Sequence, residues 1–498
     1  MEAAEESQST IWRHMAKIAG RARAALPVAL PLAAGLALRL WMLKSLFQVN
    51  GDSLIYGGLA KNLLLHGRFA LTAPNEITYP TLIRLPGYPL FLAACFRIFG
   101  VENYFAAACV QIALELLGCL LLAEFVRRIV PAPASRGAAL ATLWLAAVCP
   151  FTAAYAVVPL TETLTLFVLA LAMWAMARFR QQPGWVNALW FTFAVTLAAL
   201  LRPDGALAAV AFAPALVTGF ERGAIARRKL ISMTVVCALL ALAPFAVWTA
   251  RNWRVFHVFE PLAPRLAIDP DERPLLGWER WVKSWCLDFV STYNIYWNVP
   301  GNELDVSKLP SRAFDSPAQY AETVALAADY KSDGMVISPE IDTRFDKLTR
   351  ERIAAHPLRF YVWLPLGRVA DMWLRPRVEN LNIDLDWWVY ARHHSDTEFS
   401  WGFVALNALY LLLGFAGLCL PPQRRRPVVG GPGLRPRFWR ALLAYMVLRS
   451  ALLLTIAAPE ARYTLECFPM LFAAGGIAVG RAIERFYLSK AKALPGTP

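Results

Sequence analysis

The chain has 498 residues, of which 57% are apolar and only 17% are charged. A typical soluble domain is about 45–50% apolar and about 25% charged, so these values exclude an ordinary soluble enzyme and a disordered chain. The formal net charge of +14 would suit a nucleic-acid partner, but residues 252–399 carry 17 Lys/Arg and 22 Asp/Glu, a net of −5. The basic excess lies elsewhere in the chain, which favours a membrane protein and no nucleic-acid partner.

Ten apolar runs predict an all-α polytopic membrane protein with about ten transmembrane helices, within a range of 8–12. Several of the runs are short, and 186–220 could be one broken pair. The first run is too long for a signal-peptide core, so we expect an uncleaved first span. The runs are 24–46, 104–126, 137–157, 160–177, 186–201, 205–220, 230–250, 400–420, 438–458 and 463–483.

Basic clusters fix the expected orientation, because Lys and Arg collect on the cytoplasmic side of membrane proteins. With ten spans and a cytoplasmic N-terminus, all four clusters fall inside; they begin at Arg127, Arg178, Arg222 and Arg424. The acidic segment then falls outside. The expected plan is a cytoplasmic segment 1–23, a transmembrane catalytic region 24–250 with a first outer loop 47–103, a periplasmic mixed domain 251–399, C-terminal transmembrane helices 400–484 and a cytoplasmic tail 485–498.

Three helices are expected in the acidic segment. Ser316–Asp333 and Ile341–His356 are helical stretches, and 358–376 is apolar but carries Arg359, Arg368 and Asp371. These charges favour an amphipathic helix on the membrane surface over a full span.

The first outer loop is the most informative part of the sequence. Apolar residues recur at helical spacing from Ser53 to His66, Gly67 ends that helix, and Leu90–Phe99 forms a second short helix. We expect both helices to lie parallel to the membrane with Asp52 at the mouth of a lipid-facing cavity. Asp52 could act there as a general base, or it could cap the helix that follows it.

The order of motifs in this loop resembles that of bacterial GT-C superfamily membrane glycosyltransferases. These include the dolichyl-phosphate-mannose protein mannosyltransferases (glycosyltransferase family 39) and the aminoarabinose transferase of lipid A. The resemblance spans about 35–480. Its matching residues are Asp52, Tyr56, Ala60, Leu63, Gly67, Pro86-Gly87-Tyr88-Pro89, Leu201-Arg202-Pro203-Asp204, Arg251-Asn252, His356-Pro357, Glu460-Ala461-Arg462-Tyr463 and Pro469.

The resemblance implies a multi-pass enzyme of the bacterial inner membrane whose site faces the periplasm. It implies a sugar donor carried on a polyprenyl monophosphate, an inverting transfer and Asp52 as the base. The acceptor could be a glycan, a lipid or a protein. Relatives often carry two acids in a row here, whereas this chain has Asp52-Ser53. That departure weakens the case for a metal at the site, although a divalent metal stays open as a cofactor.

Further candidate residues bind substrate under the same hypothesis. Arg84 matches a basic residue that holds the lipid phosphate, and an arginine can grip a phosphate through two parallel hydrogen bonds. Its alternative is an ordinary lipid headgroup contact. Tyr56 and Tyr88 belong to the matched pattern. Arg202 and Asp204 lie between two apolar runs, where they could contact phosphate or sugar, or snorkel and pair.

Other acids and bases are expected near the same surface. Glu162 could bind acceptor or sugar hydroxyls, but a carboxylate at a helix start is the simpler account. Glu460, Arg462 and Tyr463 could form a salt bridge or a wall of the site. Arg39 lies inside the first apolar run, where it must face a cavity or a partner, or snorkel.

Two other classes of protein remain as alternatives. A transporter or flippase of lipid-linked saccharides would show paired halves with broken helices, which the sequence does not display. A polymerase or ligase of lipid-linked glycans would also have a long outer loop. No phosphate-binding Gly-x-x-x-x-Gly-Lys-Ser/Thr motif is present, so the sequence does not indicate a nucleotide-driven pump.

The adjacent His393 and His394 cannot chelate one metal as a helical pair, so a zinc site is not expected.

Overall fold

The computed structural model describes residues 25–218, 225–420 and 434–493. The expected cytoplasmic segment 1–23 lies outside the described residues, as do residues 421–433 with the start of the basic cluster at Arg424, and residues 494–498 of the tail.

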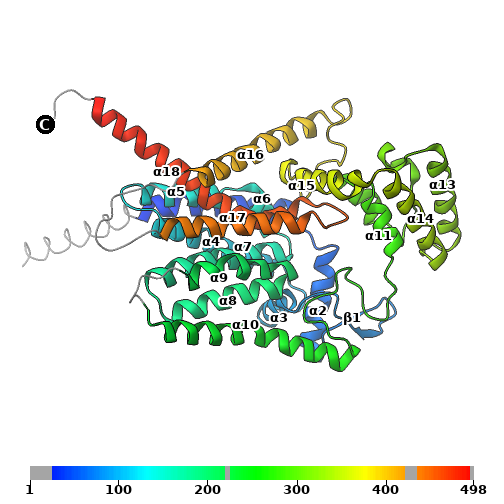
Figure 1. The fold of residues 1–498 in the computed structure, drawn as a ribbon, viewed down its shortest axis with the longest axis horizontal. Coiled ribbons are helices and arrows are strands. Elements are labelled where there is room, and N and C mark those ends of the chain that lie inside the picture. Colours follow the sequence, from blue (N-terminus) through cyan, green and yellow to red (C-terminus); the bar gives the residue numbers. More distant parts are fainter. Residues whose placement is uncertain (1–24, 219–224, 421–433, 494–498) are drawn as a thin grey trace, which may run out of the picture.

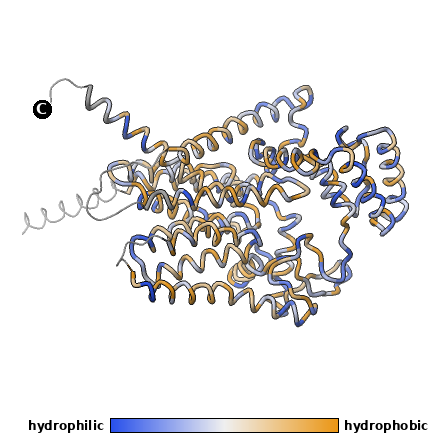
Figure 2. The backbone as a smooth tube through the Cα atoms, in the orientation of Figure 1, coloured by the Kyte–Doolittle hydropathy of each residue, from blue (hydrophilic) through white to orange (hydrophobic). Residues whose placement is uncertain are grey.

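A helix occupies every apolar run that the sequence marks as a span, and these helices form one bundle (Figure 1). Hydrophobic residues predominate along the bundle helices, whereas hydrophilic residues are more frequent in the segment at one end of the bundle (Figure 2). The helices are the first helix (Ala25–Leu46), α4 (Tyr104–Ile129), α5 (Ala134–Ala147), α6 (Pro150–Ala156), α7 (Thr161–Gln181), α8 (Trp185–Leu201), α9 (Leu207–Val217), α10 (Arg227–Phe256), α16 (His394–Cys419), α17 (Leu434–Leu453) and α18 (Phe468–Ala493).

Six of the helices are long and apolar enough to cross a membrane, and the pair α5 and α6, bent by 54°, makes a seventh within the described residues. The α8 and α9 helices are shorter, with 17 and 11 residues. The α17 helix has 20 residues and includes Arg440 and Arg449. The structure therefore supports an all-α membrane protein with six or seven candidate spans, and the count of ten stays a prediction.

Small residues let the central helices approach closely. A Cβ atom added at Gly480 would lie 2.6 Å from the backbone of Ala138, and one at Gly417 would lie 2.0 Å from the Ala474 carbonyl oxygen. These positions pack α18 against α5 and α16, as small residues do between membrane helices.

The first outer loop and the acidic segment lie at the same end of the bundle (Figure 1). Helix α2 runs across the direction of the bundle helices in this view, and β1 and β2 pair antiparallel in the same loop. The elements of the loop are α2 (Asp52–His66), β1 (Ala70–Thr72), β2 (Thr78–Pro80) and α3 (Gly87–Phe99).

Helices also build the acidic segment, around a core that includes Trp278, Trp281, Trp285 and Phe345. The acidic segment is predicted to be a mixed domain, with both helices and strands. This prediction is wrong for residues 257–393, which the structure describes in full, because this range contains helices and loops but no strand. All three expected helices are present. The elements are α11 (Leu276–Lys283), α12 (Phe289–Ser291), α13 (Pro317–Ser332), α14 (Pro339–Ala355), α15 (Leu364–Leu374), and the short helices η2 (Thr292–Tyr296), η3 (Val306–Lys308), η4 (Ser311–Ala313) and η5 (Arg359–Trp363).

Arg39 in the first helix does not snorkel. Its side chain is fully buried, and its Nε atom donates to the Glu115 carboxylate of α4. Its Nη1 atom donates to the carbonyl oxygens of Gly35 (2.8 Å) and Ala147 (2.5 Å). The ion pair ties the first helix to α4, and the hydrogen bond to Ala147 ties it to α5.

Replacing Glu115 by Gln should destabilise the bundle strongly. The change leaves the buried Arg39 charge without its counter-ion, and breaking a buried pair costs about 3–5 kcal/mol. Thermal unfolding in detergent should show a large fall in midpoint. The double variant Arg39→Met/Glu115→Leu should recover most of the loss, and equal midpoints for Glu115→Gln and wild type would contradict this role.

Candidate active site

Asp52 begins helix α2 but does not cap it. The N-cap residue is Gly51, whose φ of 49° suits glycine, and no side-chain cap hydrogen bond is present at this helix start. The capping alternative for Asp52 is therefore wrong. Its carboxylate turns instead toward two arginines from distant parts of the chain.

Each oxygen of the Asp52 carboxylate accepts from a different arginine. Arg84 Nη2 lies 2.7 Å from Oδ1, and Arg462 Nη2 lies 3.2 Å from Oδ2. Burial alone would raise the pKa of Asp52, but the guanidinium groups of Arg462 and Arg84 outweigh it and hold the pKa below its ordinary value. The Asp52 side chain is still 27% exposed, so this pairing leaves it within reach of a substrate.

Arg462 connects Asp52 to a second group of acids. It lies in the short helix η6 (Ala461–Cys467) before α18, with its Nε atom 2.6 Å from the Glu460 carboxylate and its Nη1 atom 3.6 Å from Glu162. The hydroxyl of Tyr463 donates to Glu460 at 2.5 Å. Glu162 does lie in the first turn of α7, but the simpler account as a helix-start carboxylate is incomplete because the group also forms ion pairs with two arginines.

Arg202 is the second of these arginines. It follows α8 and contacts Glu162 at 3.2 Å through Nη1 and Asp204 at 3.3 Å through Nε. Asp204 lies in the following short helix η1 (Pro203–Ala206). The guanidinium also lies over the Tyr463 ring, 5.7 Å from its centre. Arg202 is thus part of the charged cluster and does not snorkel.

Two charged residues of the cluster were missed by sequence reasoning. Glu466 of η6 lies 2.9 Å from Arg202 Nε, and Arg449 of α17 pairs with both Asp204 and Glu466. The side chain of Arg449 is fully buried. The available signal was an ionisable residue inside an apolar run, since such residues usually face a partner or a functional cavity.

The cluster as a whole contains five carboxylates and four guanidinium groups, a formal charge of −1. Its members come from segments far apart in the sequence. They are Asp52, Glu162, Asp204, Glu460 and Glu466 with Arg84, Arg202, Arg449 and Arg462. Exposure decreases from Asp52 and Arg84 to Glu466 and Arg449, so the cluster runs from an accessible mouth into the protein.

The two predicted tyrosines have different surroundings. Tyr56 borders the cluster, because Arg84 lies 6.0 Å from its ring centre. Burial and the Asp52 carboxylate raise the pKa of Tyr56 to about 12, so its hydroxyl keeps its proton. Tyr88 is fully buried, and its hydroxyl lies 2.5 Å from the side-chain oxygen of Gln111. Tyr88 therefore supports Tyr56 by packing edge-on against it, at 5.0 Å between ring centres.

Gly87 determines how closely α3 approaches the end of α8. A Cβ atom added there would lie 2.6 Å from the carbonyl oxygen of Leu200, which precedes Arg202 by two residues. The close approach leaves no room for a side chain at position 87, three residues after Arg84 in the chain.

Replacing Gly87 by Ala should therefore push α3 away from α8 and disturb both arginines. Overpacking of this kind costs about 1–3 kcal/mol. We expect a lower unfolding midpoint in detergent and a loss of substrate binding. Gly137→Ala is the matched control, because an added Cβ there meets nothing within 4 Å. Equal behaviour of the two variants would show that α3 can shift without cost.

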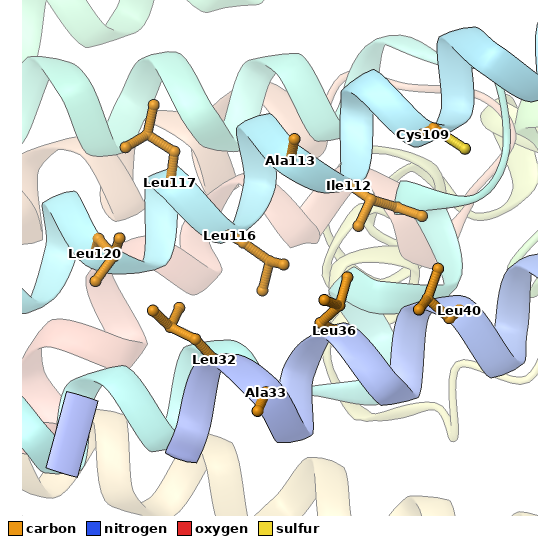
Figure 3. Close-up of a pocket in the computed structure, with 10 residues that line it drawn as sticks. All are labelled: Leu32, Ala33, Leu36, Leu40, Cys109, Ile112, Ala113, Leu116, Leu117 and Leu120. Carbon is orange, nitrogen blue, oxygen red and sulfur yellow. The ribbon is translucent and has the colours of Figure 1, made fainter. Parts of the chain in front are cut away.

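An apolar cavity of about 580 Å³ lies between the first helix and α4 (Figure 3). Residues of both helices line it, and Leu36, Ile112 and Leu116 lie in the space between the two helices. No charged residue lines it, so this cavity can receive a hydrocarbon but cannot bind a phosphate or a sugar.

One group within the described residues has the spacing of metal ligands. Ligand atoms of Asp384, His393 and Asp396 lie within 4.8 Å of one another. His393 Nδ1 is 2.9 Å from Asp384, and its Nε2 is 3.1 Å from Asp386. These acids are not adjacent to His393 in the sequence, so its pattern indicates only the adjacent histidines. All of these residues lie in the loop before α16 or in its first turns, and none belongs to the charged cluster.

Comparisons with known proteins agree with the motif order. Residues 83–248, about a third of the chain, match the family model for dolichyl-phosphate-mannose-protein mannosyltransferase. No curated protein matches the chain. Among solved structures, the Archaeoglobus fulgidus oligosaccharyltransferase tethered with an acceptor peptide is 14% identical and has a TM-score of 0.45, covering 93% of this chain and 50% of that one.

ArnT from Cupriavidus metallidurans bound to undecaprenyl phosphate is also 14% identical, with a TM-score of 0.39 and coverage of 95% of this chain and 82% of that one. The chain thus spans about half the length of the oligosaccharyltransferase, and both likenesses are too distant to assign site residues. The family match covers Arg84, Tyr88, Glu162, Arg202 and Asp204. Residues 83–248 therefore match the family model for dolichyl-phosphate-mannose-protein mannosyltransferase, in agreement with the resemblance that the sequence motifs indicate.

Proposed function

We propose that this chain is a membrane glycosyltransferase that moves a sugar from a polyprenyl-phosphate carrier to an acceptor on the outer side of the bacterial inner membrane. One observation carries the proposal. A partly exposed carboxylate, Asp52, lies between two guanidinium groups, Arg84 and Arg462, next to α2 and α3 of the first outer loop. The family match of the central region supports the same reaction class.

In the proposed reaction, an acceptor hydroxyl or amine attacks the anomeric carbon of the donor sugar. The bond between that carbon and the phosphate oxygen breaks, and the phosphate leaves with the bonding electron pair. Asp52 receives the proton of the attacking group. Attack from the side opposite the phosphate inverts the anomeric centre. The phosphate needs little protonation, so a base with cationic stabilisation of the leaving group is sufficient.

The arginines supply that stabilisation. Arg84 lies at the exposed end of the cluster and can bind a phosphate through two parallel hydrogen bonds. A phosphate bound there competes with Asp52 for Arg84 and releases Oδ1 to accept the substrate proton. Arg202, deeper in the cluster, provides a second cationic contact. Glu162, Glu460 and Tyr463 offer polar groups for sugar or acceptor hydroxyls.

The orientation of the chain belongs to the same proposal. The first outer loop and residues 257–393 lie at one end of the bundle, which suits a site on the periplasmic side (Figure 1). The polyprenyl tail would stay among the apolar helices while its phosphate reaches Arg84. The segment 251–399 would cover the site and help to select the acceptor.

The test is to incubate purified protein in detergent with a panel of polyprenyl-phosphate sugars and candidate acceptors. Release of lipid phosphate and the mass of the acceptor are followed by mass spectrometry. Stoichiometric release with a mass gain on the acceptor is the expected result. A flippase would instead move the intact lipid-linked sugar across proteoliposomes without releasing lipid phosphate, and a polymerase or ligase would transfer a glycan longer than one sugar. Either result would overturn the proposal.

A further inference from the structure

We infer that Arg449 is a positioning residue that keeps Arg202 available for the anionic part of the donor by neutralising Asp204 and Glu466. This inference rests on the proposed function and adds a residue from α17, a helix that the motif order did not connect with the site. Its evidence is the sharing of carboxylates between the partly exposed Arg202 and the buried Arg449.

Arg202 is surrounded by more negative than positive charge. Three carboxylates contact its guanidinium: Glu466 at 2.9 Å, Glu162 at 3.2 Å and Asp204 at 3.3 Å. An arginine compensated by three acids would repel a phosphate, because the local charge would be negative. Some other cation must therefore balance these acids if Arg202 is to bind an anion.

Arg449 is placed to do this. Its Nη1 atom lies 3.0 Å from Glu466 and also pairs with Asp204, so it shares two of the three carboxylates with Arg202. Arg202, Arg449, Asp204 and Glu466 together have a formal charge of zero. Its Nε atom donates to the Tyr463 carbonyl oxygen at 3.0 Å, which fixes the side chain against η6. Arg449 does not itself reach the accessible mouth, because its side chain is fully buried.

The remaining hydrogen-bonding capacity of Arg202 supports this division of roles. Its Nε atom contacts Asp204 and Glu466, and its Nη1 atom donates to Glu162 and to the Thr161 hydroxyl. Its Nη2 atom has no partner within the described residues, and the side chain is 16% exposed. Arg202 thus keeps one donor nitrogen free for a substrate oxygen, while Arg449 holds the acids behind it.

The experiment compares charge variants at two positions in the full-length protein. Arg449→Gln should raise the donor KM by about 10- to 100-fold with a smaller effect on kcat, because a charged hydrogen bond of Arg202 to the donor is weakened. Arg449→Lys should restore most of the affinity. Glu466→Gln should have the opposite effect and lower the donor KM, because it removes one of the acids around Arg202.

The double variant Arg449→Gln/Glu466→Gln separates charge from packing. It restores the charge balance, so its donor KM should return toward the wild-type value, whereas a merely structural role would make the double variant no better than Arg449→Gln. An unchanged KM in Arg449→Gln, or a raised KM in Glu466→Gln, would overturn the inference. If Arg449→Gln does not fold, Glu466→Gln and the double variant still decide the question.

Direct binding of undecaprenyl phosphate provides a readout that does not need transfer. Its Kd should follow the same order across the variants: lowest in Glu466→Gln, then wild type, then Arg449→Gln. If the Kd values follow that order but the wild-type protein transfers no sugar, the proposed function fails and the role of Arg449 in anion binding stands. Equal Kd values in all variants would reject the role of Arg449, whatever the protein transfers.

Discussion

Replacing Asp52 by Asn is expected to lower the rate of sugar transfer by about 100- to 10,000-fold, the usual contribution of a general base. The amide has almost the same shape as the carboxylate but cannot accept the proton of the attacking group. It also removes a negative charge beside Arg84 and Arg462, so donor binding should be unchanged or tighter. The change should therefore appear in kcat and not in a raised Kd for undecaprenyl phosphate.

Single-turnover transfer and lipid binding measure these two quantities separately. Asp333→Asn is a suitable control, because this residue lies beyond the end of α13 in the acidic segment and outside the charged cluster. Thermal unfolding in detergent shows whether each variant is folded. A folded Asp52→Asn protein that transfers sugar at the normal rate would refute the role of Asp52.

Replacing Arg84 by Gln should lower kcat/KM by at least about 10- to 100-fold, because the charged contact of the guanidinium with the donor phosphate is lost. Unlike the change at Asp52, it should also raise the Kd for undecaprenyl phosphate. Arg84→Lys should retain part of the affinity, since a lysine keeps the charge but cannot bind the phosphate through two parallel bonds.

Arg97→Gln provides the matched control for Arg84. It removes the same charge from the exposed side of α3, outside the charged cluster. If both arginine variants weaken lipid binding equally, the effect reflects general attraction of the lipid headgroup to a basic surface. A specific phosphate contact requires a clear difference between them. The salt dependence should also be steeper for the general attraction.

The sequence predicted the positions of the helices well, because a membrane span needs about 20 apolar residues and leaves a direct compositional signal. Helical spacing and Gly67 also predicted α2, which ends at His66 with Gly67 in the left-handed conformation. The signal was weaker for α8, α9 and α17, since short or charged helices inside a bundle need not meet that length and composition.

The local sequence could not predict the role of a residue that had two chemically reasonable roles. Asp52 could cap α2, Arg202 could snorkel, and Glu162 could serve only its own helix start. Their partners lie up to 410 residues away, as for Asp52 and Arg462, so no local pattern could distinguish these roles. Glu466 and Arg449 were missed for the same reason, because they join the cluster only through their contacts with each other, with Arg202 for Glu466 and with Asp204 for Arg449.

The sequence alone therefore determined the class of protein, the helical segments and most of the residues of the charged cluster, since apolar length and ordered motifs are local properties. Only the tertiary structure decided that Asp52 is held between Arg84 and Arg462, that Tyr88 packs in the interior and that Arg449 pairs with two of the acids around Arg202. The physical reason is that buried charges must find counter-charges in space, and the packing of distant helices selects which ones they find.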